Sequence, residues 1–327
     1  MNPTPSICVV VVAHNPGPYF SDCVQSILAQ TLAPQQIILV DNGCTDGTSA
    51  LCNKLARQHP EIEVVHRDNL GASRGRAAGL AWCREKFVCF VDGDDLLHPQ
   101  MLQWLWQACQ QTGADVSVCG LQSFSDTPPA PAPCEPSVAV LFHPHHLRGL
   151  LLDKRVEYSM CNKLYRCTLL SELTWDSPIV YNEDLYLNWA LFQKLSHVAV
   201  VEQAGYWYRQ HPQSTSHRPL NHAMLQDQKQ VAEAIYQQGQ APDTAQFVGA
   251  FYLEKLLYLD SMILRQRQPA PFKESHRDFV QAIRRQIKEQ RRNPQLSFAL
   301  KAIALMAGYL PGMYHVVCRL VLRDRQN

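Results

Sequence analysis

Five apolar residues, Phe87-Val88-Cys89-Phe90-Val91, run directly into the acidic turn Asp92-Gly93-Asp94-Asp95, which is followed by Leu96-Leu97. An uninterrupted apolar run is typical of a parallel strand covered on both faces, and such strands deliver ligand-binding groups at their carboxyl ends. Three carboxylates this close repel one another, and a divalent cation with oxygen ligands is the simplest way to neutralise them. The alternative is a polar turn that caps the helix expected to begin near Pro99, because Asp is favoured at such positions.

Composition restricts the class of protein. The 327 residues are enough for one large core and a smaller domain. With 30 basic and 29 acidic side chains, the overall charge gives no reason to expect a nucleic-acid partner. The twelve cysteines include no C-x-x-C pair, which indicates reduced thiols and argues against a zinc site or a disulfide framework. The apolar run at 7–13 is too short for a signal peptide and lacks a basic segment before it, so we expect a cytoplasmic protein.

Strand and helix patterns alternate along the first part of the chain. Continuous apolar runs predict strands at 7–13, 37–40, 62–65 and 87–91, and apolar residues at helical spacing predict a helix between each pair. Thr45 is the expected N-cap of the second helix. This alternation predicts an α/β fold with a doubly wound, mostly parallel, Rossmann-like sheet. Asp41 and the acidic turn then meet at the carboxyl edge of the sheet, where a nucleotide would bind.

The chain beyond the acidic turn is less regular. The proline-rich segment 126–137 cannot hold regular structure, so we expect an extended surface excursion there. A helix is expected to begin at Asn182-Glu183-Asp184, with apolar residues facing inward, and the runs 198–201 and 206–209 predict short strands. Beyond about Leu220 the chain is Gln-rich with long amphipathic segments. We therefore predict one domain over residues 1–220 and a helical domain over 221–327.

The order of the motifs resembles the family 2 glycosyltransferases of the GT-A fold, over roughly residues 6–217. The motifs that carry the resemblance are VVVVAHN, DNGCTDGT, NLGASRGRAAG, FVDGDDLL, CNKLYR, NEDLYLN and YWYRQHPQSTSH. The combination of DNGCTDGT with VDGDD about 45 residues later is specific, although neither half is specific alone. The resemblance implies a nucleotide-diphosphate sugar as donor, a UDP-sugar most often, and a divalent metal. It further implies a single displacement that inverts the anomeric centre, in the manner of bacterial enzymes that extend a cell-surface glycan or a lipid-linked acceptor.

The resemblance also implies a metal site in the acidic turn. It assigns the metal contact to Asp94, places Asp92 near the ribose and the metal, and makes Asp95 an outer or substitute ligand. His211 is expected to touch the metal or a phosphate, the alternative being an exposed bystander. Mn²⁺ and Mg²⁺ both suit oxygen ligands, and Gly93 is expected to let the substrate approach closely.

Contacts to the nucleotide sugar follow from the same resemblance. Asp41 is expected to accept a hydrogen bond from the base, or else only to shape its loop. Arg76 is expected to pair with a phosphate or to hold Asp41, the alternative being a solvated charge. Lys163 is expected to contact the acceptor or a phosphate, or to be a surface charge, and Arg209 suits phosphate oxygens. The complete expected set is Ala13, His14, Asn15, Asp41, Arg76, Asp92, Gly93, Lys163 and Arg209. His14 and Ala77 depart from the usual family residues, tyrosine and asparagine, and so affect the expected nucleotide contacts.

Glu183-Asp184 resembles the ED motif of the family, in which the aspartate is the general base. A base needs a carboxylate within hydrogen-bond reach of the acceptor hydroxyl and partly shielded from water. The alternative reading is that two acids at a helix N-terminus complement the helix dipole.

The C-terminal part combines basic and apolar stretches. Residues 277–292 carry six basic and two acidic side chains, and two apolar stretches follow, at 298–310 and from Pro311 to Leu322. Neither stretch reaches the roughly 20 uninterrupted apolar residues that a spanning helix needs. Two amphipathic helices on the inner face of the cytoplasmic membrane fit this pattern, as does a helical cap or a contact in a homo-oligomer.

Three rival functions are open at this point. A nucleotidyltransferase would need a Gly-rich phosphate loop after the first strand, which HNPGPYFSD does not supply. A phosphatase with an aspartate nucleophile would need acids where this chain has His14-Asn15. A binding protein without turnover would not need Asp92, Asp94 and Asp184.

Overall fold

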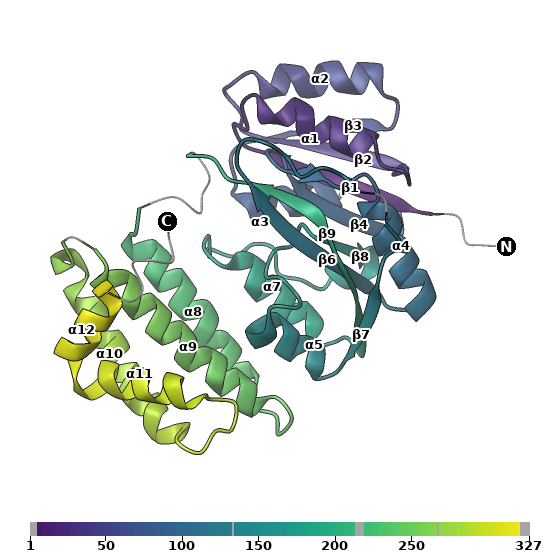
Figure 1. The fold of residues 1–327 in the computed structure, drawn as a ribbon. Helices are drawn as coiled ribbons and strands as arrows, with labels where there is room; N and C mark the ends of the chain where they lie inside the picture. Colours follow the sequence, from purple (N-terminus) through teal and green to yellow (C-terminus); the bar gives the residue numbers. More distant parts are fainter. Residues whose placement is uncertain (1–4, 133, 213–218, 267, 321–327) are drawn as a thin grey trace. The chain divides into compact units, whose positions relative to one another are not determined.

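The structure is a computed structural model that describes residues 5–132, 134–212, 219–266 and 268–320. The chain divides into two compact units, Met1–His217 and Arg218–Asn327, which we describe separately (Figure 1).

One half of the sheet in the first unit is parallel. Its strands pair in the order β3-β2-β1-β4 and lie at the positions that the apolar runs predict: β1 (Ile7–Ala13), β2 (Gln36–Asn42), β3 (Ile62–Arg67) and β4 (Phe87–Asp92). The connecting helices are α1 (Tyr19–Leu28), α2 (Thr48–Gln58) and α3 (Ala72–Leu80). Helices α1 and α2 lie on one face of this half and α3 on the other, as right-handed crossovers require (Figure 1). The sheet therefore brings the loops after β1, β2 and β4 to one edge.

The other half of the sheet is mixed. It contains β5 (Leu96–Leu97), β6 (Val116–Phe124), β7 (Val138–Phe142), β8 (Lys163–Arg166) and β9 (His197–Arg209). Strand β8 pairs antiparallel with both β4 and β6, and β9 pairs parallel with β6. The helices are α4 (Met101–Thr112), α5 (His145–Arg148) with a π-helical turn (Gly149–Asp153), α6 (Cys167–Leu170) and α7 (Glu183–Phe192). In α7 the inward side chains Leu185, Trp189 and Phe192 are fully buried, as predicted.

Three local expectations need comment. The two short strands expected at 198–201 and 206–209 are one strand, β9, bent where β6 changes register beside Gly120. Thr45 is not the N-cap of α2, because that helix begins at Thr48 after Gly47, which has φ +94°. The described residues of 126–137 contain no helix or strand, as expected.

Two glycines bring α3 unusually close to the sheet. A Cβ on Gly75 would lie 2.8 Å from Cγ1 of Val12, and a Cβ on Gly79 would lie 2.9 Å from Cγ2 of Val40 and would also meet Val10. Because real Cβ atoms do not approach so closely, both positions require glycine at this helix–sheet distance. The close packing fixes the position of Arg76, which lies between them in α3.

The second unit is helical. Its elements are α8 (His222–Gln238), α9 (Ala245–Leu264), a 3₁₀ turn (Ala270–Phe272), α10 (Lys273–Glu289), α11 (Phe298–Tyr309) and α12 (Pro311–Leu320). Helix α9 is apolar on most of its surface and packs against the other helices, so it forms the core of this unit. Across the described residues, no helix is both long and apolar enough to span a membrane.

Candidate active site

The acidic turn is held at the end of β4 by main-chain hydrogen bonds. The Gly93 N–H donates to the Val12 carbonyl (3.0 Å), and the Asp95 N–H donates to the Asp92 carbonyl (3.1 Å). A Cβ on Gly93 would lie 3.2 Å from both Ala13 Cβ and Phe20 Cδ2. The glycine is therefore needed for packing inside the protein, and its expected role in letting the substrate approach stays a prediction.

Asp95 supports the turn from inside. Its side chain is buried, and it accepts hydrogen bonds from the Tyr206 hydroxyl (2.6 Å) and from the Arg209 N–H (2.7 Å). Burial and the neighbouring carboxylates of Asp94 and Asp92 raise the pKa of Asp95 well above its ordinary value. Because it is enclosed, Asp95 is not placed to bind a metal directly, so its surroundings fit the outer of its two expected roles and not that of a substitute ligand.

Tyr206 is a site residue that sequence reasoning missed. Its hydroxyl also accepts a hydrogen bond from the Asp92 N–H (3.2 Å), so it ties two members of the acidic turn together. A tyrosine in an apolar strand gives no sign of this role, since its partner Asp95 lies 111 residues away in the chain.

Asp94 points to a different set of groups. His211 Nε2 donates to Asp94 Oδ2 (2.9 Å), and the side chain of Asp94 is 29% exposed. Arg209 Nε donates to the Asp94 carbonyl (2.9 Å), while the guanidinium lies over the rings of Tyr19 (4.6 Å) and Phe124 (4.7 Å). The structure thus brings Asp94 together with Arg209 and His211, which lie 115 and 117 residues further along the chain.

Arg76 joins the acidic turn to the start of α7. Its Nη1 lies 2.6 Å from Asp184 Oδ1 and its Nη2 lies 3.1 Å from Asp92 Oδ1. The side chain of Arg76 is only 3% exposed, so it neither contacts Asp41 nor faces solvent, and those two expectations are wrong. Because Nη1 and Nη2 of its guanidinium are both paired with carboxylates, Arg76 is also not placed to bind a phosphate directly.

The two acids of the ED motif have different surroundings. Asp184 Oδ2 accepts a hydrogen bond from the Met160 N–H (2.9 Å), and its side chain is 20% exposed. Burial and the charge of Asp184 raise the pKa of Glu183 to about 8. At neutral pH Glu183 is therefore largely protonated.

Asp41 lies in the loop after β2 and is almost completely buried. Burial alone would raise its pKa, but hydrogen bonds from Ser49 (2.6 Å), His66 (2.8 Å) and the Cys44 N–H (2.9 Å) lower it to about 2. These bonds are the loop-shaping contacts that the alternative reading of Asp41 describes.

The residues after β1 form the rest of this edge. His14 Nδ1 donates to the Asn42 carbonyl (3.0 Å), and the Asn69 amide donates to His14 Nε2 (3.1 Å). Asn15 Oδ1 accepts from the Thr45 N–H (2.7 Å). Both side chains are exposed, whereas Ala13 is buried. His14 and Asn15 therefore remain the candidates for nucleotide contacts from this loop.

Lys163 is not at the surface. It is fully buried, and its ammonium donates to the carbonyls of Glu157 (2.7 Å) and Ser159 and to Asn162 Oδ1 (2.8 Å). Burial lowers its pKa to about 8. Since its three donors are used inside the protein, Lys163 is not placed to contact a ligand, and we remove it from the expected set. Ser214, Thr215, Ser216 and His217 lie outside the described residues.

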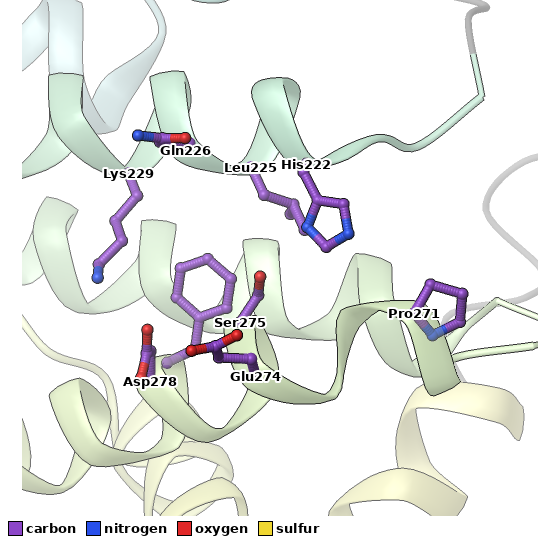
Figure 2. Close-up of a pocket in the computed structure, with 9 residues that line it drawn as sticks. His222, Leu225, Gln226, Lys229, Pro271, Glu274, Ser275 and Asp278 are labelled. Atoms are coloured by element: carbon purple, nitrogen blue, oxygen red, sulfur yellow. The ribbon is translucent and has the colours of Figure 1, made fainter.

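The second unit contains a groove of its own, of about 340 Å³, between α8 and α10 (Figure 2). Lys229 and His222 line one side of it, and Glu274 and Asp278 line the other. None of the residues expected at the active site lines this groove.

Comparison with known proteins assigns the family. The family model described as glycosyl transferase family 2 matches residues 8–174, which is half of the chain. The uncharacterized glycosyltransferase EpsJ of Bacillus subtilis is 30% identical over 240 residues, covering 71% of this chain and 70% of EpsJ. The chain belongs to glycosyltransferase family 2. It is also similar to the uncharacterized glycosyltransferase YibD of Escherichia coli, with 27% identity over 230 residues, 68% of this chain and 67% of YibD.

A solved structure agrees in fold. The structure of S. aureus TarS 1-349 in complex with UDP-GlcNAc superposes with a TM-score of 0.66 at 17% identity, covering 98% of this chain and 93% of that one. The predicted α/β fold with a mostly parallel central sheet and C-terminal helices is thereby confirmed, and so is the expectation that this family 2 glycosyltransferase is an enzyme. Among the described residues, no group of three or more His, Cys, Asp or Glu is arranged to hold a metal.

Proposed function

We propose that this glycosyltransferase moves a sugar from a UDP-sugar to a hydroxyl group of a glycan or lipid-linked acceptor, with inversion at the anomeric carbon. The observation that carries the proposal is the bridge made by Arg76. It holds Asp92 of the acidic turn and Asp184 of the ED motif on opposite ends of one guanidinium. In this proposal Asp92 contacts the donor and Asp184 accepts the proton, and the shared guanidinium would keep the two groups in the fixed arrangement that a single displacement needs.

The donor would bind at the carboxyl edge of the parallel strands. The exposed side chains of His14 and Asn15 lie there beside the loop of Asp41, and Asp92 follows the neighbouring strand. TarS, which shares the fold, has been crystallised with UDP and with UDP-GlcNAc, which supports a uridine nucleotide. Arg209 is largely buried between two aromatic rings at this edge and supplies positive charge near the acidic turn.

A divalent metal fits the donor set of Asp94 and His211. A carboxylate oxygen and an imidazole nitrogen suit Mn²⁺, and Mg²⁺ sites of this kind commonly take one or two carboxylates with the remaining ligands from phosphates and water. Asp94 Oδ2 and His211 Nε2 lie 2.9 Å apart, so the two side chains could reach one ion. When bound, the metal would neutralise the charge that develops on the departing diphosphate.

Asp184 would act as the general base. In the displacement, the acceptor oxygen forms a bond to the anomeric carbon, the bond from that carbon to the diphosphate breaks, UDP leaves, and the hydroxyl proton passes to Asp184. Arg76 and the Met160 N–H each hold one oxygen of the carboxylate, so its orientation is set before the acceptor arrives. We place the reaction at the inner face of the cytoplasmic membrane, in synthesis of a cell-surface polysaccharide, because the motif set resembles bacterial enzymes of that type.

The test is a panel of nucleotide sugars with Mn²⁺ or Mg²⁺, scored by thermal shift and by release of free nucleotide. We expect stabilisation by a UDP-sugar that EDTA abolishes. The variant Asp184→Asn should still bind the donor but lose about 100-fold or more in turnover, the order expected for loss of a general base. Asp153→Asn, an exposed aspartate in the same unit, serves as the control. Turnover near the wild-type rate in Asp184→Asn would reject the assignment of the base.

A further inference from the structure

Exposed apolar side chains gather on the last two described helices. Eleven large apolar residues are exposed among the described residues, and six of them lie between 298 and 316. We call these six the tail surface: Phe298, Leu305, Tyr309, Leu310, Met313 and Val316. Phe298 is 88% exposed. Single exposed apolar residues are ordinary, but such a gathering marks a binding surface.

Helical spacing places the exposed apolar residues of each helix on one side of that helix. Phe298, Leu305 and Tyr309 are separated by seven and four residues in α11, and Met313 and Val316 by three in α12. The opposite side of the same helices is buried through Ala304, Ala307, Tyr314 and Cys318. The apolar residues are therefore divided between a packed inner face and an open outer face.

A row of positive charge accompanies the tail surface. In α10, Arg277, Arg284 and Lys288 follow one another at seven and four residues, and Arg291 comes three residues later, just past the end of the helix. All four are exposed, and we call them the basic row. Arg284 joins the two features directly, because its Nε donates to the Gly308 carbonyl (2.6 Å) and its guanidinium lies 5.6 Å from the ring centre of Tyr309.

The acidic residues in this part of the second unit lie toward α8. Residues 290–320 contain no Asp or Glu, but they contain Arg291, Arg292, Lys301 and Arg319. In α10, Glu274 and Asp278 line the groove next to α8 (Figure 2). Glu289 Oε2 accepts a hydrogen bond from the Tyr236 hydroxyl of α8 (3.0 Å), so the acids of α10 lie toward α8. Arg284 instead faces α11, which lies beside α10 in the same unit (Figure 1).

We propose that the tail surface and the basic row dock together on an anionic phospholipid bilayer. The apolar side chains enter the boundary between headgroups and acyl chains, and the basic row pairs with lipid phosphates. Tyr309, whose ring centre lies 5.6 Å from the Arg284 guanidinium, has the amphipathic character favoured at that depth. The helices lie on the membrane surface, in keeping with the lack of a spanning helix among the described residues.

A second copy of the chain suits this surface less well. The core of a protein interface is depleted of charge, and a two-fold contact through the tail surface would bring two basic rows close together. Between residues 290 and 320 there is no acid to neutralise them. An anionic bilayer complements the apolar and the charged components at once.

The experiment is co-sedimentation of the full chain with vesicles, independent of any catalytic assay. The vesicles are phosphatidylcholine alone, or phosphatidylcholine with roughly 30% phosphatidylglycerol, at low and at high salt. We expect binding only to the vesicles with phosphatidylglycerol, and weaker binding at high salt. Phe298→Ser with Met313→Ser should weaken partitioning about tenfold or more, as should Lys288→Gln with Arg291→Gln.

Matched controls remove similar groups elsewhere. Phe142→Ser removes an exposed apolar side chain from β7, and Lys54→Gln with Arg57→Gln removes two exposed charges from α2. Circular dichroism confirms that each variant is folded. Wild-type binding that both control variants retain supports the proposal. It is overturned if the wild type stays in the supernatant, if the tail variants bind as the wild type does, or if these variants instead disperse a dimer in sedimentation equilibrium.

Discussion

Replacing Arg76 by methionine tests the central bridge of the site. Methionine keeps most of the apolar volume of the arginine stem but leaves Asp92 and Asp184 without their shared positive charge. Removing one partner of a buried ion pair costs about 3–5 kcal/mol. The arginine side chain is 3% exposed, but Asp184 is 20% and Asp92 39% exposed, so water screens the acids that remain. We therefore expect the lower end of that range, about 3 kcal/mol in the free energy of unfolding.

Tryptophan fluorescence during urea unfolding measures this loss of unfolding free energy in the structural unit that contains Arg76. All six tryptophans lie before residue 218, so the signal reports the first unit alone. A double-mutant cycle of Arg76→Met with Asp184→Asn should give a coupling energy of about 1–2 kcal/mol. The control is Arg148→Met, because Arg148 pairs with Asp153 at the surface, where both side chains are 40% exposed. Its loss should stay below about 1 kcal/mol.

Arg76→Lys separates charge from geometry. Lysine keeps the positive charge but presents a single ammonium, which cannot hold two carboxylates as a fork does. We expect an unfolding free energy between those of the wild type and Arg76→Met, with turnover lowered in both variants. A coupling energy below about 0.5 kcal/mol between Arg76 and Asp184 would refute the reasoning, because the two side chains would then act independently.

The remaining predictions concern protonation, packing and the metal. The folded-state pKa of Glu183, about 8, lies above its ordinary value, so the folded protein holds a proton that the unfolded chain releases. The free energy of unfolding should therefore fall as pH rises from about 5 to about 8, by up to about 1.4 kcal/mol per pH unit. In urea titrations at a series of pH values, Glu183→Gln should lack this part of the pH dependence. The same pH dependence in the wild type and the variant would contradict the prediction. Gly79→Ala would push α3 away from Val10 and Val40 and should cost about 1–3 kcal/mol by the same fluorescence assay, whereas Gly47→Ala, where a Cβ meets no atom, tests the φ of +94° alone. Asp94→Asn and His211→Ala should each weaken Mn²⁺-dependent donor binding at least tenfold in calorimetry. Neither variant should change the melting temperature in EDTA by more than a few degrees. A variant with unchanged Mn²⁺ dependence would remove its residue from the proposed metal site.

The parallel half of the fold could be predicted from the sequence because its signals are local. The runs before Asp41 and Asp92 are long, apolar and bounded by polar turns, and each predicts a strand without reference to the rest of the chain. Strand β8 is short, and it pairs with β4 and β6 through contacts between distant segments. Nothing in CNKLYR itself distinguishes it from a loop, so its place in the sheet appears only in the structure.

The site residues divide in the same way. Asp94 and Asp95 are adjacent and chemically identical, and only the family resemblance distinguishes their expected roles. The structure separates them because Tyr206 and the Arg209 N–H enclose Asp95, whereas Asp94 meets His211. Lys163 shows the same limit, since a lysine is normally exposed and only the carbonyls that surround it explain its burial.

The arrangement also explains why the bridge and the turn depend on each other. Asp92 is held by Arg76 through its carboxylate and by Tyr206 through its N–H, so α3, β4 and β9 meet at one residue. The same guanidinium donates a hydrogen bond to Asp184, so α7 is linked to these three elements as well. A displacement of any one of these elements would therefore move the carboxylates of both Asp92 and Asp184. The glycines that bring α3 close to the sheet thus fix the position of the guanidinium that joins the proposed donor site to the proposed base.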